Sequence, residues 1–158
     1  DHRDLHLSLR RQRQMCIRDR LSNHAIAFSS QVKHPFPDLE IYIRTPDIAQ
    51  LAACLETALS LSHWKEDGPL LRAQIRNESS QADVVLHDRA HKNYCSLWVT
   101  KNLTPWDTDL ALAKWASDEL PELEVRCSQS GWSEQESLEE RMKWYRVRAG
   151  AVDEVYWD

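Results

Sequence analysis

The amino-acid sequence predicts an α+β protein with a mainly antiparallel sheet of about six strands and two amphipathic helices on one face. Two observations lead to this prediction. Stretches that alternate apolar and polar residues outnumber the stretches with helical spacing. The strand-like stretches also follow one another directly, with only turn residues between them, which favours antiparallel pairing over strand–helix–strand crossovers. A ferredoxin-like arrangement is one topology compatible with this order.

The first predicted elements are strands. A short strand is expected over 25–28, before a loop at 34–37. Residues 39–44 then place Leu39, Ile41 and Ile43 on one face and polar or aromatic residues on the other, which is typical of a half-buried strand.

Both predicted helices follow a Thr-Pro dipeptide. Thr45, Pro46 and Asp47 precede a stretch of helical apolar spacing that runs to Leu59, so we expect Thr45 to cap the first helix. Thr104 and Pro105 repeat this device ahead of a second apolar stripe that ends at Leu120.

The other strands are recognised by alternation and by turn residues. Strands are predicted over 71–76, 84–86, 94–100 and 123–127, and a terminal hairpin over 143–148 and 152–157. The stretch 94–100 is apolar on both faces and is therefore expected at the centre of the sheet. A short acidic helix is expected to begin at Ser133. The predicted core contains Ile41, Ile43, Leu51, Leu55, Leu71, Ile75, Leu97, Val99, Leu110, Leu123 and Val125.

Residues 1–20 form an arginine-rich segment at the start of the chain. The stretch 10–20, Arg-Arg-Gln-Arg-Gln-Met-Cys-Ile-Arg-Asp-Arg, resembles the in-frame translation of a transposase-type adapter used in short-read sequencing. The stretch 1–6 resembles the flow-cell arm of the same adapter, and 7–9 fall where its index would lie. Such a segment is excluded from fold reasoning. We therefore expect a detached or disordered tail over 1–20 and a single domain over 21–158, truncated at its N-terminus because Met142 is the only methionine after the tail.

Excluding the tail changes the charge of the protein. The tail holds six arginines and three aspartates, so Lys+Arg falls from 20 to 14, Asp+Glu from 25 to 22, and the net charge moves from −5 to −8. An acidic domain repels the phosphate backbone, so no nucleic-acid partner is expected, and the charge steers it toward a basic partner.

The cysteines, the few glycines and the short apolar runs argue against several classes of site and of protein. Cys54, Cys95 and Cys127 show no CxxC spacing, which argues against a zinc ribbon and favours a reducing, cytoplasmic location. The chain has only three glycines, too few for a phosphate-binding loop or a dinucleotide fingerprint, and no cofactor is expected. No apolar run approaches the roughly 20 residues of a membrane span, so no membrane partner is expected.

The sequence offers three candidate sites based on histidine or cysteine. His87, Asp88 and His91 could bind a metal or act as general bases, but they fall between two predicted strands and favour a polar hairpin loop. Cys95 lies in an apolar strand, and a buried inert thiol is the favoured interpretation over a nucleophile. Cys54 and Cys127 lie at core positions of their elements.

The sequence also offers two candidate binding surfaces. Polar strand faces carry Tyr42, Arg44, Arg72, Arg76 and Arg126, which could form a basic face for carboxylate or phosphate groups or could be paired with Glu40 and Glu124. Acidic residues recur near Trp132, an aromatic side chain suited to anchor a partner. The predicted partner-binding residues are Trp132, Glu134, Glu136, Glu139 and Glu140, with Asp118, Glu119, Glu122 and Glu124 as a second acidic group.

A small, acidic, tryptophan-rich α+β domain without a catalytic motif resembles in type the immunity proteins of bacterial toxin systems. The resemblance implies a non-enzymatic inhibitor that blocks a basic partner sterically and electrostatically. A small enzyme or metal-binding domain using His87, Asp88 and His91 is the alternative, and a structural or regulatory domain is the third. The sequence does not determine the oligomeric state.

Overall fold

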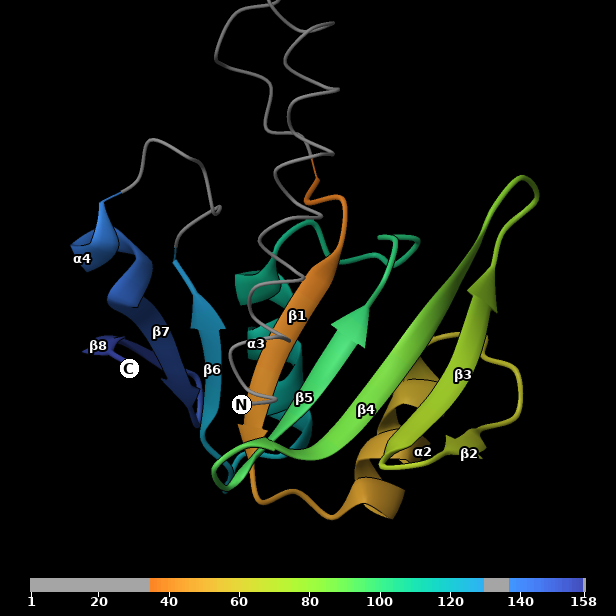
Figure 1. The fold of residues 1–158 in the computed structure, drawn as a ribbon, viewed down its shortest axis with the longest axis horizontal. Coiled ribbons are helices and arrows are strands. Elements are labelled where there is room, and N and C mark those ends of the chain that lie inside the picture. Colours follow the sequence, from red (N-terminus) through yellow and green to blue (C-terminus); the bar gives the residue numbers. More distant parts are fainter. Residues whose placement is uncertain (1–34, 130–136, 158) are drawn as a thin grey trace, which may run out of the picture.

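The computed structural model describes residues 35–129 and 137–157. Their strands form one sheet of eight, in the order β2-β3-β4-β5-β1-β6-β7-β8, and every neighbouring pair is antiparallel (Figure 1). The strands are β1 (Leu39–Arg44), β2 (Lys65–Asp67), β3 (Leu70–Arg76), β4 (Gln81–His91), β5 (Tyr94–Val99), β6 (Val125–Ser128), β7 (Lys143–Arg148) and β8 (Ala151–Tyr156). The helices are α2 (Ile48–Ala58), α3 (Asp109–Glu119) and α4 (Leu138–Met142).

The α+β class and the antiparallel sheet are confirmed, whereas the strand number is eight instead of about six. β2 was missed because its sequence, Lys-Glu-Asp, has no apolar face and is exposed along its whole length. β4 runs to His91 instead of ending near Leu86, so the segment interpreted as a loop is strand. The strand expected over 25–28 and the helix start at Ser133 lie outside the described residues.

β1 occupies an inner position of the sheet. It pairs with β5 from Leu39↔Val99 to Arg44↔Tyr94, and on its other side with β6 through Tyr42↔Arg126. The chain therefore leaves β1 through α2, forms the meander β2–β5 back to β1, and crosses through α3 to β6 on the opposite side. A ferredoxin-like arrangement is not confirmed by this order.

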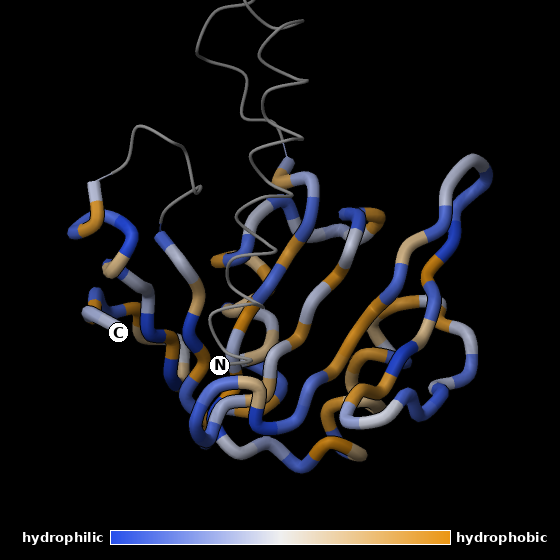
Figure 2. Tube along the Cα trace, in the orientation of Figure 1, coloured by the Kyte–Doolittle hydropathy of each residue, from blue (hydrophilic) through white to orange (hydrophobic). Residues whose placement is uncertain are grey.

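The hydrophobic core lies between the sheet and two helices, α2 and α3, which cover the same face (Figure 1). Most predicted core residues are buried there, and Leu71, Leu110 and Leu123 pack against it half-buried. Figure 2 shows why the prediction worked: hydrophobic and hydrophilic residues alternate along β1, and a continuous hydrophobic stretch marks the inner strand β4.

The second face of β1 is also buried, which corrects the expectation of a half-buried strand. Glu40 is 0% exposed and Tyr42 is 3% exposed. Tyr42 belongs to a separate aromatic cluster with Tyr94 and Trp144, against which Trp157 packs. These partners come from β5 and from the C-terminal hairpin, so local alternation around β1 gives no sign of them.

Both helices begin later than their Thr-Pro dipeptides suggested. Asp47, not Thr45, caps α2 by accepting a hydrogen bond from the Gln50 amide at 3.2 Å. Thr108, not Thr104, caps α3 by accepting from the Ala111 amide at 3.1 Å. Aspartate and threonine are both favourable N-cap residues, so the sequence offers more than one possible cap for each helix. The residue that acts as the cap is the one directly before the first helical turn.

Candidate functional site

The face of the sheet opposite α2 and α3 holds a group of charged side chains joined by ion pairs. Strand alternation places Arg44 of β1 opposite Tyr94 of β5, and Arg126 of β6 opposite Arg146 of β7. Glu124 precedes β6, and its backbone carbonyl accepts a hydrogen bond from the Arg44 amide at 2.9 Å. We call Arg44, Tyr94, Glu124, Arg126 and Arg146 the Glu124 cluster.

Three guanidinium groups share the Glu124 carboxylate. Arg126 Nη2 lies 3.5 Å and Arg146 Nε 3.6 Å from Glu124 Oε1, while Arg44 Nη1 lies 4.0 Å from Oε2. None of these distances is that of a short, bidentate arginine–carboxylate pair. The Tyr94 hydroxyl donates a hydrogen bond to Glu124 Oε2. The predicted pairing of Arg44 and Arg126 with Glu124 is thus present, and Arg146 joins it.

Aromatic rings hold Arg126 in place. Its guanidinium carbon lies 5.3 Å from the centre of the Tyr94 ring and 5.1 Å from that of Trp157, within the range of cation–π attraction. Arg126 is 17% exposed, and its buried Nε atom makes no hydrogen bond to any described residue. The side chain is therefore rigidly placed and still has donor capacity.

The cluster shifts the acidity of its two acidic groups. Burial by itself raises the pKa of Glu124, but the Tyr94 hydrogen bond and the charges of Arg126 and Arg146 outweigh it and lower that pKa. Burial and the hydrogen bond to Glu124 raise the pKa of Tyr94 to about 12. At neutral pH the carboxylate is therefore charged and the phenol is protonated.

The charge balance of the cluster is positive. Three arginines face one glutamate, and the further acidic partner is Asp153 of β8, whose Oδ2 lies 3.3 Å from Arg146 Nη2. Arg44 and Arg146 are 58% and 40% exposed, so solvent reaches them. A cluster with positive charge and unused N–H donors is chemically suited to bind a carboxylate or a phosphate group.

Strained backbone adjoins the cluster. Thr45, Arg89 and Lys92 have positive φ values of 42°, 50° and 52°, a region that non-glycine residues rarely adopt. The Thr45 amide donates to the Asn93 carbonyl at 2.8 Å and so joins the end of β1 to the β4–β5 turn. Arg89, near the end of β4, and Lys92, in this turn, are exposed and add positive charge at the same end of the sheet. Strain of this kind persists only where the surrounding structure enforces it.

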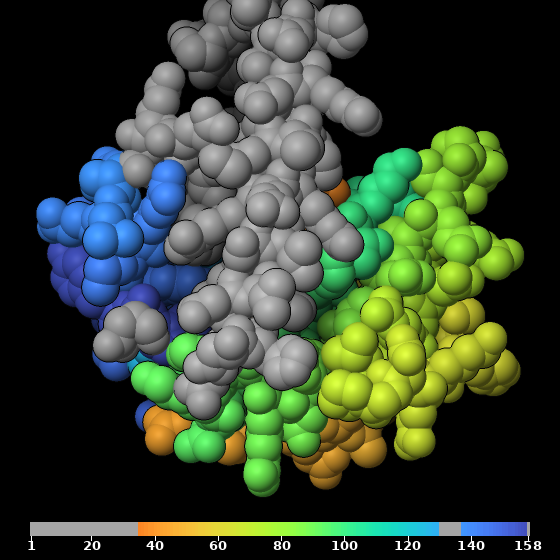
Figure 3. Space-filling view, in the orientation of Figure 1, coloured from red at the N-terminus to blue at the C-terminus, as the bar shows by residue number. Residues whose placement is uncertain are grey.

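Arg72 and Arg76, the other arginines of the predicted basic face, lie on β3, with β4 and β5 between them and β1. In Figure 3 the yellow-green surface of this region is well separated from the blue surface of β7 and β8. The structure therefore divides the predicted face in two. Tyr42, which the sequence predicts to be exposed on this face, is buried.

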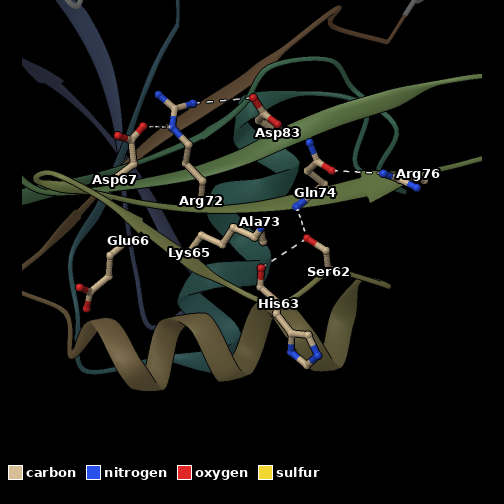
Figure 4. A pocket seen from close by; sticks show the side chains of 10 residues that line it. All are labelled: Ser62, His63, Lys65, Glu66, Asp67, Arg72, Ala73, Gln74, Arg76 and Asp83. Atoms are coloured by element: carbon tan, nitrogen blue, oxygen red, sulfur yellow. Dashed lines mark hydrogen bonds and ion pairs between the residues drawn. The ribbon is translucent and has the colours of Figure 1, made fainter.

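Arg72 and Arg76 line a pocket of about 670 Å³ at the β2 edge (Figure 4). Arg72 is neutralised by Asp67 at 2.9 Å and by Asp83 at 3.7 Å. Arg76 donates to Gln74 Oε1 at 3.4 Å. Positive and negative side chains are mixed in this pocket, so its arginines are less available to a ligand than those of the Glu124 cluster.

The His87–His91 segment belongs to β4. His87 pairs with Ser96 and His91 with Tyr94, across an irregularity in the register, so the two histidines share a face. The His91 ring lies 4.9 Å from the Trp157 ring. Among the described residues there is no group of three or more side chains that could hold a metal ion.

The three cysteines occupy the positions expected of core residues. Cys95 and Cys127 are buried and Cys54 is half-buried. Burial and the nearby Asp88 carboxylate raise the pKa of Cys95 to about 12, and burial and Glu119 raise that of Cys54. A raised pKa suppresses the thiolate, which is the nucleophilic form.

Only part of the predicted acidic site lies among the described residues. Trp132, Glu134 and Glu136 lie outside them. Glu139 and Glu140 are exposed on α4, where the Glu140 carboxylate accepts a hydrogen bond from the Ser137 amide at 2.8 Å and closes a capping box. Asp118, Glu119 and Glu122 are exposed, whereas Glu124 is 11% exposed and belongs to the arginine cluster.

Sequence reasoning missed Tyr94, Arg146 and Trp157 as site residues. Tyr94 lies on β5, whereas Arg146 and Trp157 belong to the C-terminal hairpin, and the three meet only because β5, β1, β6, β7 and β8 are neighbours in the sheet. The alternation of 143–148 does place Trp144 and Arg146 on one strand face, but nothing in it identifies the strand beside them.

Comparison of the chain with protein-family models, with curated proteins and with solved structures found no match. Within the described ranges, no helix has the length and apolar character needed to cross a membrane.

Proposed function

We propose that this chain is a non-enzymatic binding protein that recognises an anionic group of its partner through the Glu124 cluster. The observation that supports it is the sharing of one carboxylate by Arg44, Arg126 and Arg146 at 3.5–4.0 Å. Each guanidinium carries five N–H donors, so one carboxylate leaves most of them for a ligand or for water.

The arrangement favours binding over chemistry at the same place. Arginine remains protonated at any physiological pH and cannot act as a general base. The Tyr94 hydroxyl, with a pKa of about 12, holds its proton. Rings and backbone contacts fix Arg126 before a ligand arrives, which reduces the entropy that binding loses.

The experiment uses inorganic phosphate and phenyl phosphate as probes, with binding followed by the NMR shifts of the arginine side-chain N–H groups. Saturable shifts of the Arg44, Arg126 and Arg146 signals are expected. The double variant Arg44→Gln, Arg146→Gln should weaken binding about tenfold or more, since each lost charge-assisted hydrogen bond contributes about 1.5–3 kcal/mol.

The matched control is Arg72→Gln, Arg76→Gln, which removes two arginines from the same face outside the cluster. This variant should bind both probes as the unchanged protein does. Equal weakening in the two double variants, or shifts that never saturate, would mean that only diffuse positive charge is involved, and the proposed site would be wrong.

A second candidate is the immunity-like function, in which the acidic segment blocks a basic partner. One observation favours it: Leu138, beside Glu139 on α4, is 72% exposed. An exposed leucine followed by two glutamates offers an apolar contact beside negative charges that would attract a basic partner. The proposed contacts are Trp132, Glu134, Glu136, Glu139 and Glu140.

The test of this candidate is association with a basic partner purified from the source organism. Glu136→Lys with Glu139→Lys should slow association and reduce its salt dependence, and Trp132→Ala should speed dissociation. Glu139 is preferred to Glu140 for charge reversal because the Glu140 carboxylate takes part in the capping box of α4. Association and dissociation rates that change with neither salt concentration nor any of the three substitutions would exclude this site.

A small enzyme or metal-binding domain is the remaining alternative. His87 and His91 share a face of β4, which is the observation in its favour. Metal content of the purified protein tests it: a stoichiometric transition metal that His87→Ala removes would support this alternative, and a metal-free protein that binds none on dialysis would exclude a metal role.

A further inference from the structure

The two edges of the sheet differ in their capacity to accept another strand. β2 forms one edge; it has three residues, all charged and exposed, a common way of blocking strand addition. β8 forms the other edge, is six residues long, and among the described strands has only β7 as a neighbour.

The hydrogen-bond pattern shows which backbone groups of β8 face outward. The β7–β8 loop is the pair Ala149-Gly150, both with positive φ, and Arg148 pairs with Ala151 across it. The Trp157 amide donates to the Met142 carbonyl at 2.9 Å, so odd-numbered residues of β8 bond to β7. The N–H and C=O groups of Val152, Glu154 and Tyr156 therefore point away from the sheet.

The same three residues present an exposed side-chain row. Val152 is 38% exposed and Tyr156 is 63% exposed, two of the three exposed large hydrophobic residues in the described part of the chain. Glu154 lies between them and is exposed. The neighbouring Asp153 is paired with Arg146, whereas no ion pair joins Glu154 to a described residue. Along β8 the three side chains of this row are therefore apolar, acidic and apolar.

We propose that β8 accepts an extended segment of a partner protein that carries the pattern apolar–x–basic–x–apolar. Its backbone would bond to Val152, Glu154 and Tyr156, its basic side chain would lie opposite Glu154, and its apolar side chains would cover Val152 and Tyr156. Main-chain bonds of this kind provide affinity, and alternate side chains provide specificity. This inference rests on β8 alone and is independent of the Glu124 cluster.

A second copy of the chain fits the edge less well. The antiparallel register that places Val152 beside the second copy's Tyr156 also places Glu154 opposite the second copy's Glu154. Like charges directly opposite each other destabilise a strand pair. Charge complementarity therefore favours a basic segment over self-pairing at neutral pH.

The probe is the blocked peptide Thr-Val-Thr-Arg-Thr-Val-Thr, added at millimolar concentration to the full chain and followed by backbone amide NMR. The amides of Val152, Glu154 and Tyr156 should shift together and saturate, while those of Asp153 and Val155, already bonded to β7, should change little. Replacing the central arginine of the peptide by glutamate should weaken binding roughly fivefold, as expected for a cross-strand charge pair.

Two controls separate strand addition from other contacts. A peptide N-methylated at its arginine and both valines should not bind, whereas one N-methylated at the threonines, whose N–H groups face away from β8, should bind normally. Glu154→Lys should reverse the preference, so that the glutamate peptide binds better than the arginine peptide.

Several outcomes would overturn the proposal. These are no shift at the three outward amides, equal binding of the two N-methylated peptides, or an unchanged charge preference in Glu154→Lys. Concentration-dependent dimerisation that Glu154→Pro abolishes would show that a second copy occupies the edge instead. Failure of phosphate binding at the Glu124 cluster would leave this proposal unaffected.

Discussion

At the residue scale, Glu124 links the charges of three strands. It lies just before β6, accepts the Tyr94 hydroxyl, and faces Arg44, Arg126 and Arg146. In the sequence it reads as one more member of an acidic run, because neither tyrosine nor arginine is nearby except Arg126. Its role depends on partners from other strands, such as Tyr94, which lies 30 residues away in the chain.

Glu124→Gln should lower the free energy of unfolding by about 1–3 kcal/mol at pH 7, because it removes the negative charge that three arginines share. Because the pKa of Glu124 is lowered in the folded protein, its contribution is present above the unfolded value near 4.5 and is lost as the pH falls through the folded value. Urea denaturation between neutral and acidic pH measures this difference, which should shrink on acidification.

The control for this experiment is Glu154→Gln, which removes an exposed charge that makes no ion pair with a described residue. It should change stability by less than about 0.5 kcal/mol at every pH. A Glu124→Gln protein as stable as the unchanged one at pH 7 would contradict the proposed stabilisation of the cluster by Glu124.

At the element scale, α2 is capped by Asp47, whereas the sequence predicted Thr45 as its cap. Asp47→Ala should lower the free energy of unfolding by about 1 kcal/mol because the Gln50 amide loses its acceptor. Thr45→Ala should cost nothing, since Thr45 lies before the cap with a φ of 42°, where a β-branched residue has no advantage. Thermal or chemical denaturation of both variants checks this; the reverse order of stability would restore Thr45 as the cap.

The packing of α2 against the sheet provides the second prediction at this scale. Leu55 is 0% exposed and Ile75 of β3 is 5% exposed, and both belong to the main core. Truncation of either to alanine should cost about 2–5 kcal/mol through lost burial and a residual cavity.

Leu138→Ala is the matched control for these truncations, because the same number of carbon atoms is removed from a side chain that is 72% exposed. Its stability should change by less than about 0.5 kcal/mol. Losses under about 1 kcal/mol at both Leu55 and Ile75 would show that the assigned core face is wrong.

At the scale of the whole molecule, the adapter resemblance of residues 1–20 makes a prediction about folding. We propose that this segment derives from an adapter, and a segment of that origin would not have been selected to pack against residues 21–158. Deletion of residues 1–20 should therefore change the free energy of unfolding by less than about 0.5 kcal/mol. Chemical denaturation of the full and shortened chains measures it, and a loss of about 2 kcal/mol or more would show that the segment contributes to the fold.

Local patterns in the sequence determined the fold class, two helices, six of the eight strands within a few residues, and most of the core. Alternation and helical spacing report directly which side chains of an element turn inward, as Ile41 and Leu55 show. Even the β7–β8 hairpin followed from Ala149-Gly150 and the alternation around it.

Only the tertiary structure decided which strands are neighbours, and with it the candidate site. The position of β1 between β5 and β6 buries Tyr42, brings Tyr94 and Arg146 to Glu124, and separates Arg44 from Arg72. Strand neighbours are chosen by the packing of the whole sheet on α2 and α3, since each strand's own pattern fits many partners equally well. A local sequence pattern therefore specifies the face on which a side chain lies, but not the side chains it meets there.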